Sequence, residues 1–467
     1  MIPFFPKQIA NKAIMLYLVA LTAVSLTFYS YAMSWEYIIM GVVWVSGFFA
    51  LTSFCSRKWL AFTPQRFVSI VAMVAFGVRL FWVVFSYFFY LSKTGQPFEF
   101  EAADSMGYWE DSVWLISEKW SVAFDYLFKS RDTISDSGYV LYLTALGKIL
   151  GPNILVTRIV KALLSTATVL LIYKLAKRNI GEEGARLAAV MACFMPNLIV
   201  YCGLHLKENE MLFLIMAFLE RADYLLRSRR YSVFTILVPM LLLFSLFTFR
   251  TLLGVAGVFA FGTAVLFTHT SVIGRRKRVL LIGWFLLAAL VLGGTTIISE
   301  TEFMWEQRFS NQETKRLSQT LRGSQWAKYA TGTVMAPIMF VLPFPTMISV
   351  DEQYNQQVLS GGNYVRNVLG GFVLLAVIGA LFVKKNWRDL SLIGSFVIAY
   401  LGVISMSGFS NSERFLLPGL PVLLIMAAYG VTLLDVRNYR IIKVWYIIVP
   451  LMAIGWAVFK LGSRGLL

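Results

Sequence analysis

Long apolar segments alternate with short polar ones along almost the whole chain. A helix that crosses a bilayer needs about 20 mostly apolar residues in succession, and runs of this kind recur often enough to predict about thirteen transmembrane helices. The predicted spans are 13–33, 36–55, 67–92, 154–175, 187–205, 211–226, 231–249, 251–270, 279–298, 365–383, 389–408, 415–434 and 445–462. The pattern therefore predicts an all-α polytopic membrane protein.

One further apolar run, 331–350, is interrupted by Pro337, Pro343 and Pro345. Proline lacks the backbone N–H of a helical hydrogen bond and bends the chain. We expect this run to be re-entrant or packed on the outer surface. The alternative is a true span, which would move every later connection to the opposite side of the membrane.

Lysine and arginine gather at alternate connections between the predicted spans. The clusters are Lys7 and Lys12; Arg57, Lys58 and Arg66; Lys174, Lys177, Arg178 and Arg186; Arg227, Arg229 and Arg230; Arg275, Arg276, Lys277 and Arg278; Lys384, Lys385 and Arg388; and Arg437, Arg440 and Lys443. Cytoplasmic loops carry an excess of such residues, and all seven clusters share one side if 331–350 does not cross. We therefore expect a multi-pass protein of the cytoplasmic membrane with a cytoplasmic N-terminus.

The same topology places two long polar segments, 93–138 and 299–364, on the outer face. Because connecting segments carry much of a membrane protein's specific chemistry, we expect the active site there. The chain then divides into two N-terminal helices (1–66), a core module (67–298), an outer segment (299–364) and C-terminal helices (365–467).

The composition narrows the class of protein further. Hydrophobic residues make up 58% of the 467 positions and charged residues 14%, against roughly a quarter charged in soluble domains, which excludes a soluble multidomain enzyme and a disordered chain. The net charge of +17 lies mainly in the cytoplasmic turns and does not indicate nucleic-acid binding. The three cysteines and two histidines lack metal-ligand spacing. The sequence contains no Gly-rich phosphate-binding loop, so it does not indicate ATP-driven transport.

The first outer segment is acidic, with nine acids against four bases in 93–138, a net charge of 4 − 9 = −5. Trp114, Phe124 and Phe128 are spaced as in amphipathic helices that lie on a membrane surface. A carboxylate in such a segment can act as a general base toward a bound hydroxyl. Asp104, in ADSMGYW, is our first candidate and Asp136, in DSGY, the second. The alternative is a solvated acidic loop with an aromatic belt.

Charged residues also stand at the outer edges of several predicted spans. A short turn between the fifth and sixth spans contains Lys207, Glu208 and Glu210, and Arg158, Arg250 and Arg414 lie at outer helix ends. Outer arginines depart from the positive-inside trend, and a guanidinium binds a lipid-linked phosphate through paired hydrogen bonds. The alternatives are surface ion pairs and contacts with phospholipid headgroups.

Arg79 falls in the middle of the third predicted span. A charge at that depth is costly unless it faces the protein interior. We expect it to point into the bundle toward an acidic or carbonyl partner.

This combination resembles the C-type (GT-C) glycosyltransferases, in the branch of protein O-mannosyltransferases and lipid A aminoarabinose transferases. Most of the resemblance lies in DSGYVLYLTALGKILGPNILVTRIVKALLSTATVLLIYKLAKRNIGEEGARLAAVMACFMPNLIVYCGLHLKENEMLF and in ERFLLPGLPVLLIMAAYG, within residues 79–435. In this chain the acidic loop follows the third span instead of the first, which two extra N-terminal helices would explain. The adjacent Asp-Glu pair of the family is also absent at Asp104, and the nearest adjacent acids are Glu110 and Asp111.

The resemblance implies a fold of GT-C type and the transfer of a sugar from a polyprenyl-phosphate donor to an acceptor glycan, lipid or protein outside the membrane. Asp104 would act as the base, with Asp136, Glu110 and Asp111 as the other catalytic candidates. The donor phosphate would lie at Arg250 and Arg414. The remaining residues expected to bind substrate are Lys207, Glu208, Glu210, Arg158, Tyr108, Tyr139 and Arg308.

No cofactor is strictly needed, because the donor is already activated, and we assign no metal ligands, although carboxylates of the acidic loop would suit Mg or Mn. Two other functions fit the sequence less well. One is a surface-polysaccharide polymerase or ligase with a diphosphate-linked oligosaccharide donor. The other is a lipid-linked sugar flippase or transporter, which predicts internal repeats and several charges deep in the membrane.

Overall fold

The computed structural model describes residues 2–130, 134–228, 232–268, 274, 278–279, 281–283, 344–350, 354–406, 413–435, 439–462 and 466. The described helices are α1 (Lys7–Thr27), α2 (Trp35–Lys58), α3 (Pro64–Thr94), α4 (Ala103–Ser117), α5 (Trp120–Asp125), α6 (Ser137–Leu150), α7 (Ile154–Phe194), α8 (Pro196–Val200), α9 (Glu208–Arg227), α10 (Val233–Phe249), α11 (Thr251–Phe267), α16 (Tyr354–Val358), α17 (Ser360–Ile378), α18 (Ser391–Met406), α19 (Glu413–Leu416), α20 (Leu420–Thr432) and α21 (Tyr439–Gly462).

The helices confirm an all-α, multi-pass membrane protein. Within the described ranges, seven helical segments are long and apolar enough to cross a membrane: Lys7–Thr27, Trp35–Ala61, Pro64–Thr94, Ile154–Phe194, Ser360–Val383, Glu413–Thr432 and Tyr439–Gly462. Helices α10, α11 and α18 are apolar but shorter. Every predicted span except 279–298, which lies largely outside the described residues, overlaps a described helix. The number thirteen stays a prediction.

Helix α7 consists of two antiparallel halves that meet at Gly181. This residue has φ 83° and ψ 172°, a conformation that glycine adopts without the steric cost a Cβ would impose. Tyr173 in the first half donates to Glu182 in the second at 2.7 Å. Farther from the turn, Lys161 donates to the carbonyl of Leu204 at 2.8 Å. The two predicted spans 154–175 and 187–205 therefore correspond to one helical hairpin.

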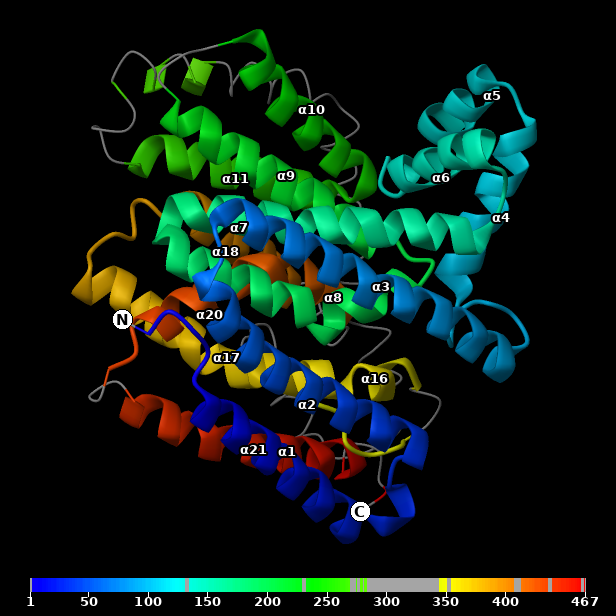
Figure 1. Ribbon diagram of the computed structural model, residues 1–467. Helices are drawn as coiled ribbons and strands as arrows, with labels where there is room; N and C mark the ends of the chain where they lie inside the picture. The colour runs from blue at the N-terminus through cyan, green and yellow to red at the C-terminus, as the bar shows by residue number, and fades with distance from the viewer. Residues whose placement is uncertain are drawn as a thin grey trace.

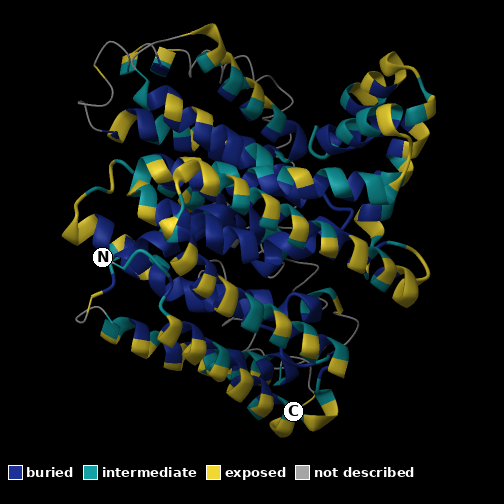
Figure 2. Ribbon diagram, in the orientation of Figure 1, coloured by how far each residue is buried: buried dark blue, intermediate teal, exposed yellow. Residues whose placement is uncertain are grey.

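The helices stack in layers in Figure 1, with α9, α10 and α11 along one side and α1 and α21 along the other. The central layers contain α3, α7, α8, α17 and α20, and Figure 2 shows that buried residues concentrate there. The short helices α4, α5 and α6 form a lobe at one end of this stack (Figure 1). Trp114, Trp120 and Phe124 of the lobe are between 44% and 48% exposed, as expected of a surface-lying amphipathic segment.

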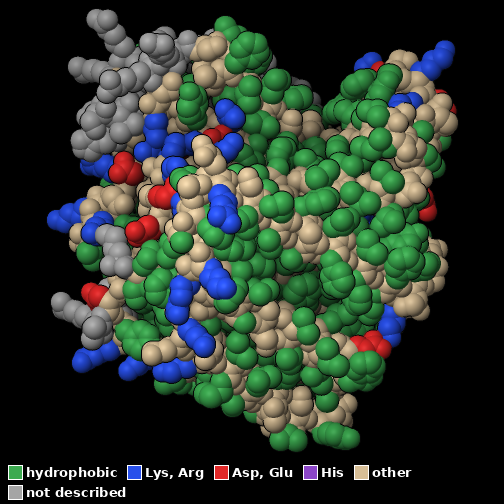
Figure 3. Space-filling model, in the orientation of Figure 1, with side chains coloured by type: hydrophobic (Ala, Val, Ile, Leu, Met, Phe, Trp, Pro, Cys, Tyr) green, Lys and Arg blue, Asp and Glu red, His purple; other side chains and the backbone are tan. Residues whose placement is uncertain are grey.

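Basic residues gather at the end of the bundle opposite this lobe, as Figure 3 shows. Hydrogen bonds and ion pairs link these connections to one another: Arg186 donates to the carbonyl of Phe62 at 2.8 Å, Arg178 pairs with Glu220 at 2.8 Å, and Arg227 donates to the carbonyl of Asp389 at 3.3 Å. The basic clusters of 57–66, 174–186, 227 and 384–388 thus share one end of the protein, as the alternating pattern predicted.

Part of the proline-containing run is described, and this part is not helical. Ile348 forms an isolated β-bridge with Ala32, and Ser349 donates to the carbonyl of Tyr31 at 2.7 Å. Residues 29–32 follow the end of α1 that lies away from the basic clusters. The contacts place 344–350 at the same end as the lobe, while 331–343 lie outside the described residues.

Arg79 is fully buried in α3, and among the described residues it donates only to neutral acceptors, which confirms the expected carbonyl partner. Its guanidinium contacts Ser165 Oγ at 2.8 Å and the carbonyls of Cys193 and Ala192, each at 3.1 Å. A fourth contact goes to the carbonyl of Ala75, one turn earlier in α3, at 3.2 Å. The two carbonyls lie just before Pro196, where the helix ends and their own N–H partners are missing. One side chain therefore ties α3 to both halves of α7.

We expect Arg79→Leu to lower the free energy of unfolding by about 3 kcal/mol, because it leaves several buried acceptors without a donor. Unfolding of the purified protein in mixed detergent micelles measures this loss. Arg79→Lys should give an intermediate value, since an ammonium can satisfy only part of the set. The exposed Arg66→Leu is the control, and an equal effect of the two leucine variants would contradict the role of Arg79.

Candidate functional site

Four chain segments meet at the lobe end of the bundle and carry most of the predicted site residues. They are the first turn of α4, the residues just before α6, the turn 204–207 before α9, and α19. Asp104 and Glu208 stand in the first turns of α4 and α9, where the positive end of the helix dipole favours a carboxylate. Asp136 has φ 75°, a left-handed conformation that aspartate tolerates better than most residues.

Arg414 connects two of these segments. Its guanidinium pairs with Glu208 through Nε and with Asp104 through Nη1. The Glu208 side chain is 0% exposed and that of Asp104 is 59% exposed. Arg414 is thus held from below by a buried carboxylate and shares its outer edge with an accessible one.

A second ion pair lies beside the first. Lys207 pairs with Asp136 and also donates to the carbonyl of Phe249 at 3.1 Å. Tyr108 donates to the second oxygen of Asp136 at 2.9 Å. Burial raises the pKa of Tyr108 to about 12, so its hydroxyl remains a hydrogen-bond donor at neutral pH. Ser135 also donates to Asp136, at 3.4 Å. Asp136 is therefore committed to three donors.

Arg250 differs from the other cations of the site. It is half-buried, and its guanidinium lies 4.5 Å from the centre of the Phe415 ring and donates to Tyr400 at 3.4 Å. Arg414 lies 6.0 Å from the same ring, so the two guanidinium groups flank one aromatic side chain. Among the described residues, no carboxylate lies within ion-pair distance of Arg250. Its positive charge is not neutralised by a direct contact within this part of the chain.

Behind this pair of cations lies a fully buried layer. Lys161 and Glu210 are 3.6 Å apart, and their side chains are 0% and 3% exposed. Lys161 also contacts the hydroxyl of Tyr139 at 3.4 Å, and that hydroxyl donates to the carbonyl of His205 at 3.3 Å. Glu210 and Tyr139 therefore support the turn 204–207 and do not face outward.

Three predicted residues of the set lie apart from Arg414. Arg158 is buried and donates to the carbonyl of Pro97 at 2.5 Å. Glu110 is exposed on α4, and Asp111 accepts a hydrogen bond from Tyr126 inside the lobe at 3.3 Å. Arg308, together with the rest of 284–343, lies outside the described residues.

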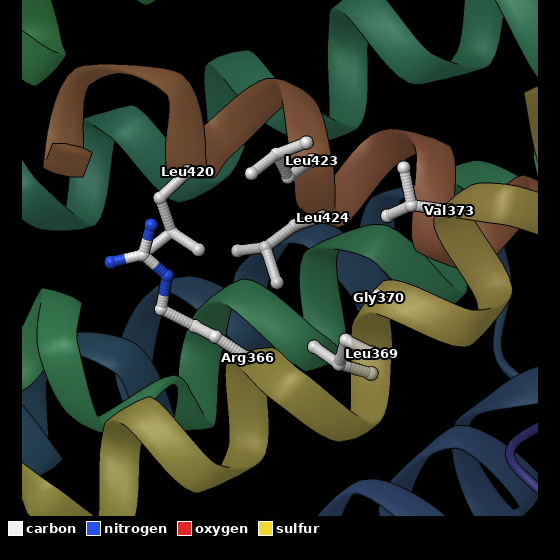
Figure 4. Close-up of a pocket in the computed structure, with 7 residues that line it drawn as sticks. All are labelled: Arg366, Leu369, Gly370, Val373, Leu420, Leu423 and Leu424. Carbon is white, nitrogen blue, oxygen red and sulfur yellow. The ribbon is translucent and has the colours of Figure 1, made fainter. Parts of the chain in front are cut away.

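A neighbouring polar cluster was not predicted. Glu413 accepts hydrogen bonds from Asn363 at 2.8 Å and from Asn197. The guanidinium of Arg366 lies nearby at the end of a small cavity between α17 and α20, with Leu420 and Leu424 beside it (Figure 4). That cavity measures about 10 Å³, room for about one water molecule. The only sequence signal for this cluster was that Glu413 is adjacent to Arg414. The cluster packs behind α19 and supports it from the inside of the bundle.

The charge pairing bears on metal binding as well. Within the described ranges, no three His, Cys, Asp or Glu side chains gather in a way that could hold a metal ion. The acids of the site contact cations or hydroxyl donors instead.

A scan against models of known protein families finds no match for this chain, and a search of curated proteins finds no similar sequence.

Arg414 should hold the first turn of α4 against the bundle. We expect Arg414→Ala to increase amide hydrogen exchange at 104–109, because the start of α4 loses its ion pair with α19, and to leave α4 beyond Ser112 unchanged. Mass spectrometry of the detergent-purified protein gives the measurement. Arg57→Ala, at the opposite end, is the matched control. Unchanged exchange at 104–109 in Arg414→Ala would show that α4 is held by other contacts.

Proposed function

We propose that this protein is a glycosyltransferase of GT-C type, which transfers a sugar from a polyprenyl-phosphate donor to an acceptor hydroxyl at the outer face of the cytoplasmic membrane. One observation carries the proposal. A cation without a carboxylate contact among the described residues, Arg250, lies beside Arg414, and Arg414 in turn contacts the accessible carboxylate of Asp104. This arrangement supplies an anion site and a base next to each other.

The donor phosphate would lie between the guanidinium groups of Arg250 and Arg414. Arginine forks bind phosphate through two parallel, charge-assisted hydrogen bonds. Glu208 holds Arg414 in place through Nε and leaves its terminal nitrogens for other acceptors. Neutralising the phosphate in this way also stabilises it as a leaving group.

Asp104 would act as the general base. A phosphate that takes over the Nη1 contact of Arg414 frees the Asp104 carboxylate, which can then accept the proton of the acceptor hydroxyl. The acceptor oxygen forms a bond to the anomeric carbon, the bond from that carbon to the phosphate oxygen breaks, and polyprenyl phosphate leaves with the electron pair. The proton stays on Asp104 until solvent removes it. The scheme needs no further cofactor, because the donor is already activated.

The orientation is part of the proposal. The candidate site lies at the end of the bundle opposite the basic clusters, and cytoplasmic loops carry an excess of lysine and arginine. The candidate site is then external, where a lipid-linked donor in the outer leaflet reaches it from the side. The lobe of α4, α5 and α6, with exposed Trp114 and Trp120, would rest on that leaflet.

We expect Asp104→Asn to reduce sugar transfer by about 100-fold or more, because general-base catalysis contributes 10²–10⁴ in rate. The assay follows release of polyprenyl phosphate from a synthetic polyprenyl-phosphate sugar by the purified protein. Glu110→Gln, an exposed acid on the same helix, should retain the wild-type rate. A rate near wild type in Asp104→Asn would remove Asp104 from the mechanism.

We expect Arg250→Met to weaken donor binding about tenfold, since the donor phosphate loses one charge-assisted contact. Native mass spectrometry with polyprenyl phosphate, and with the uncharged polyprenol as the control ligand, gives the comparison. Arg250→Lys should recover part of the affinity, and polyprenol binding should not change. Equal loss for both ligands would point to a packing role for Arg250. Binding and movement of the lipid without any transfer would favour the flippase alternative.

A further inference from the structure

A second feature of the lobe end is an open cavity of about 450 Å³ beside the first turn of α4. Its lining includes the rings of Phe100 and Tyr354, the acids Glu99 and Glu101, and Ala102 and Met106. Small-molecule sites commonly have volumes of 300–1,000 Å³, so the cavity has room for a mono- or disaccharide. Because Ala102 and Met106 flank Asp104 in sequence, the cavity adjoins the helical turn that carries the proposed base.

Aromatic side chains form one side of the cavity. The rings of Phe100 and Tyr354 are 5.0 Å apart, and Phe100 also packs on Tyr90 at 5.6 Å, which fixes its position. The Tyr354 side of this pair remains 39% exposed. An exposed ring of this kind presents an apolar face, and the C–H face of a pyranose is the matching surface of a sugar.

Carboxylates line the cavity beside these rings. Glu99 is only 4% exposed, and Ser105 and the backbone N–H of His205 donate to its two oxygens, the latter at 3.4 Å. Glu101 is exposed and has φ 55°, an unfavourable conformation for a residue with a Cβ. A carboxylate accepts strong hydrogen bonds from hydroxyl groups, so both acids suit a polyhydroxylated ligand.

The charge of the cavity disfavours an anionic ligand. The fully buried guanidinium of Arg158 interacts electrostatically with Glu99, and its Nε and Nη1 have no hydrogen-bond partner among the described residues. Arg158 therefore offsets the negative charge of Glu99. Glu101 forms no ion pair within the described part of the chain, so it leaves the lining with a negative charge. A uronic acid or a phosphate would be repelled by Glu101.

From the cavity, its rings and its carboxylates we infer that this pocket binds the acceptor of the transfer as a neutral sugar, stacked on Phe100 and Tyr354 and hydrogen-bonded to Glu99 and Glu101. The role of this sugar as the acceptor rests on the proposed function, whereas the binding of a neutral sugar in the pocket does not. The acceptor is then a glycan or a glycolipid headgroup, and Glu101 discriminates against acidic sugars.

Saturation-transfer difference NMR on the full-length protein in detergent tests this binding. The probes are methyl mannoside and methyl glucoside, with methyl glucuronide and methyl glucosaminide as the acidic and basic counterparts. We expect the neutral glycosides to bind in the millimolar range and Tyr354→Ala to weaken them at least fivefold. We expect Glu101→Lys to admit the glucuronide, and Glu110→Lys, which adds the same charge elsewhere on the lobe, to change nothing.

The outcomes separate this inference from the proposed function. Binding of the neutral glycosides that Tyr354→Ala leaves unchanged would overturn the pocket, even if Asp104→Asn abolishes transfer. Binding of the glucosaminide alone would also overturn it and assign the cavity to a cation. Glycoside binding that Tyr354→Ala removes, in a protein whose transfer Asp104→Asn does not affect, would support the pocket and reject the base.

Discussion

Burying a charge in a bilayer-embedded protein costs several kcal/mol unless the charge finds a partner, and the charged groups of this protein are arranged around that cost. For Arg79 this cost is offset by hydrogen bonds to neutral oxygens, three of which belong to the two halves of α7. At the basic end, Arg178 forms ion pairs with Glu220 and Asp223 of α9, which offset the same cost. These contacts join α3, α7 and α9 into a frame, and the turn 204–207 takes its position from that frame.

Much of this fold could be predicted from the sequence, because spans and basic clusters are properties of consecutive residues. The apolar runs located the helices, and the alternation of basic clusters placed connections from 57 to 388 at one end of the protein. Depth alone predicted the inward direction of Arg79. Gly181 was harder to interpret, because a single glycine in a short polar connection gives no sign that two spans will form one continuous hairpin with no intervening loop.

The candidate site could be predicted only in part, because it is made of pairs. Asp104, Glu208 and Arg414 stood out singly, yet no spacing shows that a guanidinium 310 positions away from an aspartate will contact it. Glu110 and Asp111 are acidic like Asp104, and they differ from it in the face of α4 that they occupy. Glu99 resembled any other acid of an acidic segment, and its burial beside Arg158 depends on the end of α3 and the start of α7 being packed together.

The pairing also bears on the order of events in the proposed reaction. Asp104 and Arg414 form an ion pair with each other. When an anion takes the place of the Asp104 carboxylate, Arg414 binds that anion and Asp104 becomes available as the base. A neutral acceptor cannot compete for Arg414, whereas the donor phosphate can. The donor would therefore bind first and release the base, and the acceptor, whose proposed cavity adjoins the same turn of α4, would meet an active carboxylate only when a donor is present.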